Sequence, residues 1–450
     1  MKKIVVLGGG IGGYVSAIRA SQLGGEVTLI EEKEIGGTCL NVGCIPAKLF
    51  LSAARNYISM KNANNFGLSI NDISFDMKKL VERKNKVVEE LRNGIMHLLK
   101  KNKVRYINGS GKIVSSDCVS VKNEKINMDA TIIATGSSVA ELKDIQIDHD
   151  KIISSNDAFE LRELPKEIII VGGGAIGVEF ACFFNSFGTK VTIIEILPNL
   201  LPQEDGAISK ILEREMKKRG IEVITNGFIE KIGKKDNLEV DVKNFGKIKA
   251  EKLLLCVGRI PNTKDIGLEN VGIKTNNGWI EVNEKMETNV KNFYAIGDVV
   301  GGKLLANKAI AEGLVAASNL LGIDKKIEKN LIPNAIFSIP EIGSVGLTEE
   351  NALKLGYKIK TGRFPFRALG RARADGKIEG EVKVIADENT KKIIGLHIIG
   401  EHATELIGIG VTAMKFGAKI DELDSLFSHP TYSEAIEEAF WDLEKRAIHW

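Results

Sequence analysis

Apolar and polar positions along the chain repeat one pattern twice. Each copy consists of an apolar strand, a glycine-rich turn, a helix and a second apolar strand. In that order, the predicted elements span 4–7, 8–13, 14–23 and 27–30 in the first copy and 168–171, 172–177, 178–187 and 191–194 in the second. A glutamate closes each copy, and it follows the middle glycine of the turn by 21 positions both times (10 to 31 and 174 to 195).

The remaining pattern predicts further elements of both kinds. The charged stretch 72–103 has the amphipathic spacing of a long helix that begins near Phe75, and 104–119 reads as short strands. An apolar strand is predicted at 131–133. Towards the C-terminus, alternating positions predict strands at 381–386 and 392–399, followed by helices.

The two glycine-rich turns have the properties of dinucleotide-binding sites. Glycines permit the tight turn, let the backbone approach a pyrophosphate, and let the helix pack closely on the strand. The free N–H groups at the helix N-terminus attract the diphosphate, and the closing carboxylate accepts hydrogen bonds from a ribose. Two copies in full strand–turn–helix–strand context predict two bound dinucleotides. The glycines concerned are Gly8, Gly10 and Gly13 in the first copy and Gly172, Gly174 and Gly177 in the second.

Glu195 favours NAD over NADP in the second copy. A carboxylate at this place repels the extra phosphate of NADP, and the following stretch 196–202 contains no Arg or Lys to receive it.

Composition is that of an ordinary globular protein. The chain has 450 residues, which suggests several domains, and 62 basic against 59 acidic side chains give a net charge of +3. This near-balance gives no reason to expect nucleic acid or a membrane as partner. No run of about 18 uninterrupted apolar residues is present. The first strand follows Met1 almost directly, and the five cysteines are an odd number, so we expect a cytoplasmic protein.

Cys39 and Cys44 are the candidate redox centre. They lie five positions apart, soon after the first dinucleotide-binding pattern, and a thiol pair there could store two electrons as dithiol and release them as disulfide. A structural disulfide or half of a zinc site are the alternatives, but zinc would need two further ligands at matching spacing.

The stretch around these cysteines, Gly-Gly-Thr-Cys-x-Asn-x-Gly-Cys-x-Pro-x-Lys at 36–48, resembles the redox-active segment of the flavoprotein disulfide reductases. Three further motifs resemble the same family: Ala-Thr-Gly at 134–136, Val-Gly-Arg-x-Pro-Asn at 257–262, and His-Pro-Thr-x-Ser-Glu at 429–434. The resemblance covers essentially the whole chain. It implies FAD in the first site, NAD in the second, and a Cys39–Cys44 disulfide between them.

The resemblance also implies individual roles for cofactor-binding residues. Glu31 would bind the adenosine ribose of FAD and Thr38 would lie near its pyrophosphate. Lys48 would pair with Glu179 beside the flavin and stabilise the reduced ring, where the alternative is a solvated surface lysine. Asp298 would bind the ribityl hydroxyls, where the alternative is a surface-turn aspartate. The further cofactor contacts expected are Gly37, Gly111, Thr135, Gly136, Gly258 and Ala306.

His429 is the candidate base. A lone histidine is most often a capping or packing residue, but it matches the family motif and lies five residues before Glu434. Histidine can deprotonate a dithiol near neutral pH, and the glutamate would orient its ring. In the family this histidine reaches the disulfide of the opposite subunit, which implies a homodimer.

The resulting fold class is α/β, with two Rossmann-like domains for FAD and NAD and a C-terminal α+β dimerisation domain. We expect an FAD-binding domain with the redox disulfide at 1–139, an NAD-binding domain at 140–262, a return to the FAD domain at 263–330, and the dimerisation domain at 331–450.

Within the family, the resemblance is strongest to enzymes that oxidise protein-bound dihydrolipoamide and pass a hydride to NAD. A separate lipoylated carrier protein or acyltransferase of a multienzyme complex would be the partner. Mercuric reductases and large thioredoxin reductases need C-terminal redox residues, but the last cysteine here is Cys256. Another disulfide reductase of the family, or a non-catalytic flavoprotein scaffold, is the alternative. Two positions depart from the family pattern, which often has histidine where this chain has Asn307 and Ile339.

Overall fold

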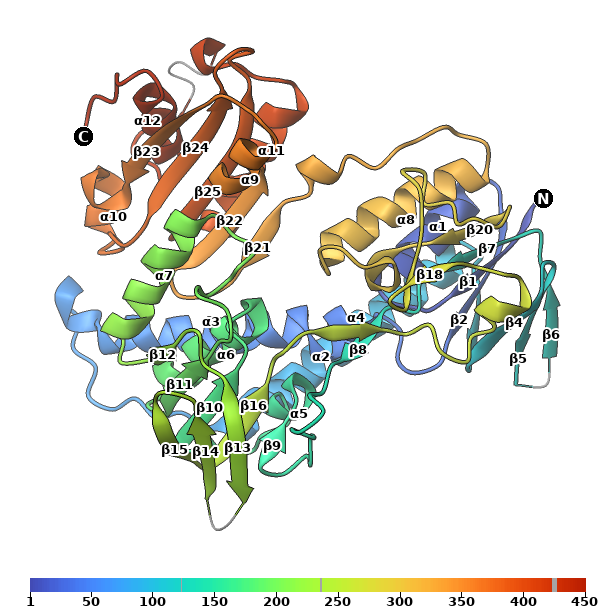
Figure 1. Ribbon diagram of the computed structural model, residues 1–450, viewed down its shortest axis with the longest axis horizontal. Coiled ribbons are helices and arrows are strands. Elements are labelled where there is room, and N and C mark those ends of the chain that lie inside the picture. Colours follow the sequence, from blue (N-terminus) through green and yellow to red (C-terminus); the bar gives the residue numbers. More distant parts are fainter. Residues whose placement is uncertain (123, 235–236, 423–426) are drawn as a thin grey trace.

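The computed structural model describes residues 1–122, 124–234, 237–422 and 427–450. Figure 1 shows three lobes. The N-terminal segment and the segment around α8 (Ala306–Leu320) share one lobe, the green middle segment forms a second, and the orange and red C-terminal segment forms the third.

The first lobe is built on a parallel sheet with the strand order β20-β7-β1-β2-β3. Its central strands are apolar and buried because helices cover one face of the sheet and the strands within 111–127 pack on the other. β20 comes from a distant part of the chain and pairs with β7, so residues 293–295 complete this sheet. The strands are β1 (Lys3–Leu7), β2 (Glu26–Glu31), β3 (Arg105–Asn108), β7 (Ala130–Ile133) and β20 (Phe293–Ala295).

Small residues let the helix α1 (Ile11–Gln22) pack closely in this sheet. A Cβ atom on Gly13 would lie 1.9 Å from the carbonyl oxygen of Gly8, so no larger residue fits without displacing the turn. The helix begins three residues before the predicted start at 14, because Gly10 already has extended backbone geometry and serves as N-cap.

The second lobe repeats the plan with the strand order β12-β11-β10-β16-β9, also parallel. Helices α6 (Ala175–Ser186) and α7 (Gly206–Lys218) accompany the sheet. Both predicted Rossmann-like units are therefore confirmed. The strands are β9 (Ile152–Ile153), β10 (Glu167–Val171), β11 (Lys190–Ile194), β12 (Glu222–Ile224) and β16 (Lys252–Leu255).

Two short strands join the lobes. β8 (Ser137–Val139) leaves the first lobe and β17 (Arg259–Pro261) returns to it, and they pair antiparallel. Three small sheets and a short helix complete these lobes: β4 (Gly111–Ser115), β5 (Cys118–Val121) and β6 (Glu124–Asn127); β13 (Ile229–Lys234), β14 (Leu238–Val242) and β15 (Gly246–Ala250); β18 (Thr275–Asn276) and β19 (Trp279–Ile280); and α5 (Ser155–Ala158).

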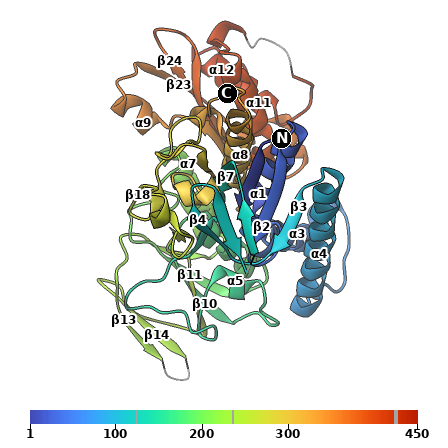
Figure 2. The ribbon, with the colours of Figure 1, turned by 90° about the vertical axis from the view of Figure 1, so that its right-hand side faces the viewer.

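The helix α4 (Met77–Lys101) matches the predicted amphipathic helix and lies beside the edge strand β3 (Figure 2). It starts after Asp76 rather than at Phe75, because the Asp76 carboxylate accepts hydrogen bonds from the N–H groups of Lys78 and Lys79 and caps the helix.

The C-terminal lobe is an antiparallel sheet with the order β21-β22-β25-β24-β23, flanked by helices. Its strands include the two predicted near 381–386 and 392–399. The elements are β21 (Asn334–Ile336), β22 (Glu341–Gly346), β23 (Ile359–Pro365), β24 (Glu381–Asp387), β25 (Ile393–Gly400), α9 (Glu349–Lys354), α10 (Gly370–Ala374), α11 (Ala403–Lys415) and α12 (Glu434–Asp442).

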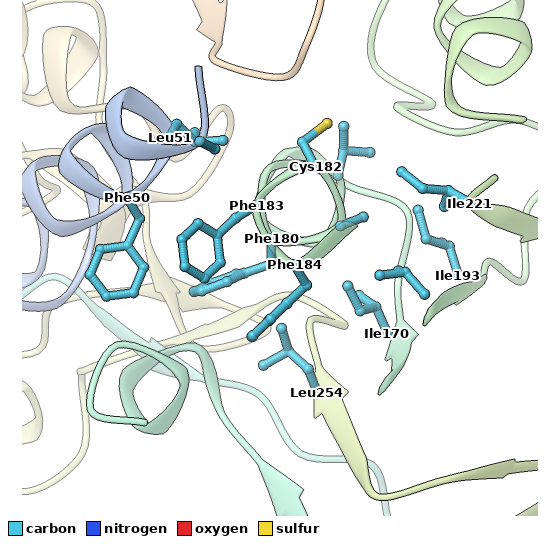
Figure 3. Close-up of a cluster of buried hydrophobic side chains, with 14 of the residues drawn as sticks. Phe50, Leu51, Ile170, Phe180, Cys182, Phe183, Phe184, Ile193, Ile221 and Leu254 are labelled. Atoms are coloured by element: carbon cyan, nitrogen blue, oxygen red, sulfur yellow. The ribbon is translucent and has the colours of Figure 1, made fainter. Parts of the chain in front are cut away.

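The helices α2 (Gly37–Val42) and α3 (Cys44–Lys61) connect the first two lobes. Phe50 on α3 packs against Phe183 on α6, with ring centroids 4.8 Å apart and the ring planes tilted by 35°, and Figure 3 shows the two rings as neighbours. By length and composition alone, the stretch Gly37–Lys61 could cross a membrane, but core helices of soluble proteins meet the same criterion. α3 contacts α6 and α4, and 28% of the apolar window in this stretch is buried inside the protein.

A buried cluster of charges joins the second lobe to the third. The Lys383 ammonium on β24 lies 2.7 and 2.8 Å from the two carboxylate oxygens of Asp205 and 2.6 Å from Glu349. Lys383 and Asp205 are almost completely buried. Burial raises the pKa of Asp205, but the hydrogen bonds from Lys383 lower it, and the net direction is down.

Replacing Lys383 by Met should destabilise the fold. The variant leaves the Asp205 charge buried without its partner, which costs about 3–5 kcal/mol in the free energy of unfolding measured with urea. Because the pKa of Asp205 lies below its ordinary 3.8, this contribution is present at neutral pH and fades as the pH falls below that value. The exposed Lys217, paired with Glu213, is the control, and Lys217→Met should change stability by less than about 0.5 kcal/mol. Equal effects of the two substitutions would contradict this role.

Candidate active site

The structure joins Cys39 and Cys44 in a disulfide, as the resemblance implied. Cys39 lies in α2 and Cys44 is the first residue of α3, with Cα atoms 4.6 Å apart. This separation is within the ordinary range for a disulfide. The other three cysteines, Cys118, Cys182 and Cys256, are free thiols.

The disulfide borders a cavity of about 600 Å³ that residues of all three lobes line. The glycine-rich turn of the first unit lines it directly. The second unit contributes the start of α6, with Ala175, Ile176 and Glu179, whereas Gly172, Gly174, Gly177 and Glu195 do not line it. Ten of the expected site residues line this cavity: Gly10, Gly13, Thr38, Cys39, Cys44, Lys48, Gly136, Glu179, Asp298 and Ala306.

The two glycine-rich turns have the same hydrogen-bond geometry. Glu31 accepts from the N–H of Gly9 at 2.5 Å and from that of Lys33 at 2.7 Å. Glu195 accepts from the N–H of Gly173 at 2.6 Å and from that of Leu197 at 2.8 Å. Each carboxylate is thus held at the end of its second strand, against the glycine turn, where a ribose would lie.

Close backbone contacts explain two of the glycines in these turns. Gly8 and Gly172 have φ angles of +102° and +105°, in the region that favours glycine. A Cβ atom on Gly8 would lie 2.2 Å from the carbonyl oxygen of Ala134, and one on Gly172 would lie 2.3 Å from that of Cys256. Both turns can therefore adopt this geometry only with glycine at these positions.

Lys48 and Glu179 form the expected pair across the lobes. The ammonium lies 3.1 Å from a Glu179 carboxylate oxygen and 4.1 Å from the centre of the Phe337 ring. The N–H of Phe337 donates to the same carboxylate at 2.9 Å. Phe337 was not anticipated from the sequence, because it belongs to the C-terminal lobe and meets the pair only in the folded chain.

Asp298 lies in a 3₁₀ turn (Gly297–Val300) after β20. Gly297 has φ +74° and ends the extended backbone. The Ser137 hydroxyl donates to the Asp298 carboxylate at 2.5 Å, and Arg259 donates to the same hydroxyl at 2.7 Å. Burial lowers the pKa of Arg259, and the nearby Asp298 acts in the opposite direction.

Ser137 and Arg259 were missed as site residues. Arg259 also reaches the Thr38 hydroxyl at 3.4 Å and so links three segments of the cavity wall. Arg259 belongs to the motif Val-Gly-Arg-x-Pro-Asn and directly follows Gly258, an expected cofactor contact. This position was the signal in the sequence that could have identified it as a site residue.

Glu434 is the first residue of α12, and His429 lies in the turn before it. The ring Nδ1 is 2.6 Å from one Glu434 carboxylate oxygen, and the N–H of Thr431 donates to the other at 2.7 Å. The His429 side chain is 82% exposed, and neither residue is among those that line the cavity beside the disulfide. Within one chain, the pair is therefore formed but is not brought to the cysteines.

The other expected positions lie around the two turns. Thr135 donates its hydroxyl to the Asn262 carbonyl at 2.7 Å, and Gly111 packs against Leu7 and Ile30. Gly258 follows β16, and Gly37 approaches Gly10 closely. Of the two departures from the family pattern, Asn307 lines the cavity and donates to the Pro333 carbonyl at 2.7 Å, while the N–H of Ile339 donates to the Cys182 sulfur.

A disulfide between two dinucleotide-binding units defines an oxidoreductase that exchanges electrons between thiols and a nucleotide. The sequence agrees with this class. Residues 2–313 match the family described as pyridine nucleotide-disulphide oxidoreductase, and residues 332–440 match the dimerisation domain of that family. The chain belongs to the pyridine nucleotide-disulphide oxidoreductase family. Its expected cofactors, FAD and NAD, and its expected fold class are thereby confirmed.

Known relatives are similar over the full length. The dihydrolipoyl dehydrogenase of Bacillus subtilis is 40% identical over 99% of both chains, and the mitochondrial one of Pisum sativum is 38% identical over 99% of this chain and 92% of its own. Among solved structures, the HOCl-induced flavoprotein disulfide reductase RclA from Escherichia coli, as its Cu(II) complex, has a TM-score of 0.87 at 30% identity. It covers 97% of this chain and 99% of its own.

Replacing Glu195 by Gln should weaken NAD binding and reduce the preference for NAD over NADP. The variant removes a charged acceptor, so we expect the KM for NAD to rise about tenfold or more. The matched control is Glu31→Gln in the other unit, which should weaken FAD retention and leave the KM for NAD unchanged. Steady-state kinetics with both nucleotides measures the ratio, and an unchanged ratio in Glu195→Gln would rule out the assigned role.

Proposed function

We propose that this protein catalyses the NAD-linked oxidation of protein-bound dihydrolipoamide to lipoamide, the reaction of the dihydrolipoyl dehydrogenases. The observation that carries the proposal is the Cys39–Cys44 disulfide beside a cavity lined from both dinucleotide-binding units. Full-length similarity to enzymes named dihydrolipoyl dehydrogenase supports this choice of substrate within the family.

The two cysteines take the electron pair from the substrate. A substrate thiolate attacks the sulfur of Cys39, the Cys39–Cys44 bond breaks, and Cys44 leaves as a thiolate. The second substrate thiol then loses its proton and attacks the mixed disulfide, so the substrate departs oxidised and Cys39 is left reduced. Two electrons and two protons leave the substrate in all, and the two cysteines hold the electrons.

His429 removes the proton of the substrate thiol, and Glu434 orients the imidazole ring of His429. The short contact between Nδ1 and the carboxylate leaves Nε2 as the nitrogen that can face a thiol. Since His429 is exposed and lies outside the cavity of its own chain, we propose a homodimer in which it serves the disulfide of the partner. The match of residues 332–440 to a dimerisation domain supports this arrangement.

The cavity residues hold and orient the cofactors. The chemistry that bound FAD would supply is transfer of the electron pair of the reduced cysteines to NAD as a hydride. Glu31 would bind the adenosine ribose of FAD, Asp298 would accept hydrogen bonds from the ribityl hydroxyls, and Lys48 would present positive charge near the flavin ring. Glu179 and Phe337 keep the ammonium in place through the contacts described above.

The lipoyl group is carried by a separate protein, namely a lipoylated carrier or an acyltransferase of a multienzyme complex. The names of the relatives support this partner. We further propose a cytoplasmic location. The three free thiols, beside a single disulfide between the candidate redox cysteines, support it.

Replacing either Cys39 or Cys44 by Ser should abolish dihydrolipoamide turnover, to below about one-thousandth of the unmodified enzyme, because no disulfide can form. Bound FAD and its reduction by NADH should persist, since neither glycine-rich unit is altered. Cys118→Ser is the control, because this buried thiol lies in β5, outside the cavity, and its turnover should be unchanged. Full turnover by Cys44→Ser would overturn the assignment.

A further inference from the structure

Lys308 and Glu312 form a buried ion pair on α8 that has no role in the reaction described above. They lie one helical turn apart, with the ammonium 3.0 Å from the carboxylate, and only 9% and 2% of the two residues are exposed. Burying two charges costs free energy that their attraction often fails to recover. Stabilisation of the fold is therefore a weak explanation for this buried pair, and the contacts that the two side chains make with other residues indicate another role.

Both side chains bind the same residue, Gly297. Glu312 accepts a hydrogen bond from the N–H of Gly297 at 2.7 Å, and Lys308 donates one to the carbonyl oxygen of Gly297 at 3.3 Å. Bonds to charged partners are stronger than those between neutral groups. Gly297 has φ +74°, and a Cβ atom there would lie 3.3 Å from the Cβ of Ala309, so the residue is held closely against α8.

Gly297 directly precedes Asp298, the proposed partner of the flavin ribityl chain. Gly297 and Asp298 line the cavity beside the disulfide. Lys308 and Glu312 instead line a different cavity, of about 800 Å³, and are not among the residues that line the first. The ion pair thus contacts the wall of the proposed flavin site from outside the cavity and does not line the cavity itself.

We propose that Lys308 and Glu312 are positioning residues for flavin binding, which act by fixing both polar groups of Gly297 and thereby the direction of the Asp298 carboxylate. The inference rests on the proposed FAD site. It does not depend on which disulfide or dithiol the enzyme uses.

The electrostatics of Glu312 agree with this role. Burial raises the pKa of Glu312, while Lys308, the N–H of Gly297 and Lys329 act in the opposite direction. Removal of the Lys308 charge therefore favours the protonated carboxyl group, which is a weaker acceptor for the Gly297 N–H.

The test compares FAD release from the unmodified holoenzyme with FAD release from the double variant Lys308→Met/Glu312→Leu. The two substitutions fill the space of the ion pair with apolar groups and leave neither charge buried without its partner. We expect the dissociation constant of FAD, measured by flavin fluorescence, to rise about tenfold or more, with a change in the visible flavin spectrum. Lys217→Met/Glu213→Leu is the matched control, because it removes an ion pair with the same four-residue spacing from α7, outside the cavity, and should leave FAD affinity unchanged.

A second comparison separates positioning from general support of the fold. In an Asp298→Asn background, the double variant should cause little further loss of FAD, because the residue that it positions has already lost its charge. Glu312→Gln, which keeps an acceptor for the Gly297 N–H, should cause a smaller loss and serves if the double variant does not fold. Unchanged FAD affinity, or a loss that adds in full to that of Asp298→Asn, would overturn the proposal. Because no dithiol is used, a failure of the lipoamide assignment would be seen separately, in turnover.

Discussion

The contact between α3 and α6 is the constraint on which the rest of the site depends. α3 begins at Cys44 and α6 begins at the second glycine-rich turn, so their packing sets the distance between the disulfide and the second nucleotide site. Phe50 and Phe183 supply the apolar part of this contact (Figure 3), and the Lys48–Glu179 ion pair supplies the polar part. Residues 44, 48 and 51 share one helix face and all line the cavity. One helix thus carries a redox sulfur, a positive charge and the packing that aligns both.

The two glycine-rich units use the same backbone arrangement. In both units a glycine with positive φ passes a carbonyl group too closely for a side chain, and a glutamate is held by two backbone N–H groups. The units differ in what surrounds these features. The first is completed by β20 and the Asp298 turn, which places a carboxylate in the wall of the cavity that the disulfide borders. Glu195 of the second is buried and does not line that cavity. The same backbone arrangement can therefore hold two different dinucleotides.

The parts of this site that follow from local chemistry were predictable from the sequence. The glycine turns, the closing glutamates and the short cysteine spacing are each contained within about thirty residues, and the Lys48–Glu179 and His429–Glu434 pairs followed from family motifs. Contacts between distant segments were not predictable in this way. Phe337 on the Lys48–Glu179 pair, Arg259 between Ser137 and Thr38, and Lys308 with Glu312 on Gly297 depend on how separate lobes and strands meet. The observed starts of α1 and α4 differ from the predicted starts by three and two residues. The N-cap residues, Gly10 and Asp76, set these starts.

The central claim is that a dithiol reduces the Cys39–Cys44 disulfide and that the electrons then pass through FAD to NAD. Anaerobic titration of the holoenzyme with dihydrolipoamide, followed by addition of NAD, tests it most directly. The account predicts that a long-wavelength absorbance band develops with dihydrolipoamide and disappears when NAD is added. An absorbance spectrum that does not respond to dihydrolipoamide, while NADH still reduces the flavin, would contradict the claim and would indicate a different disulfide substrate.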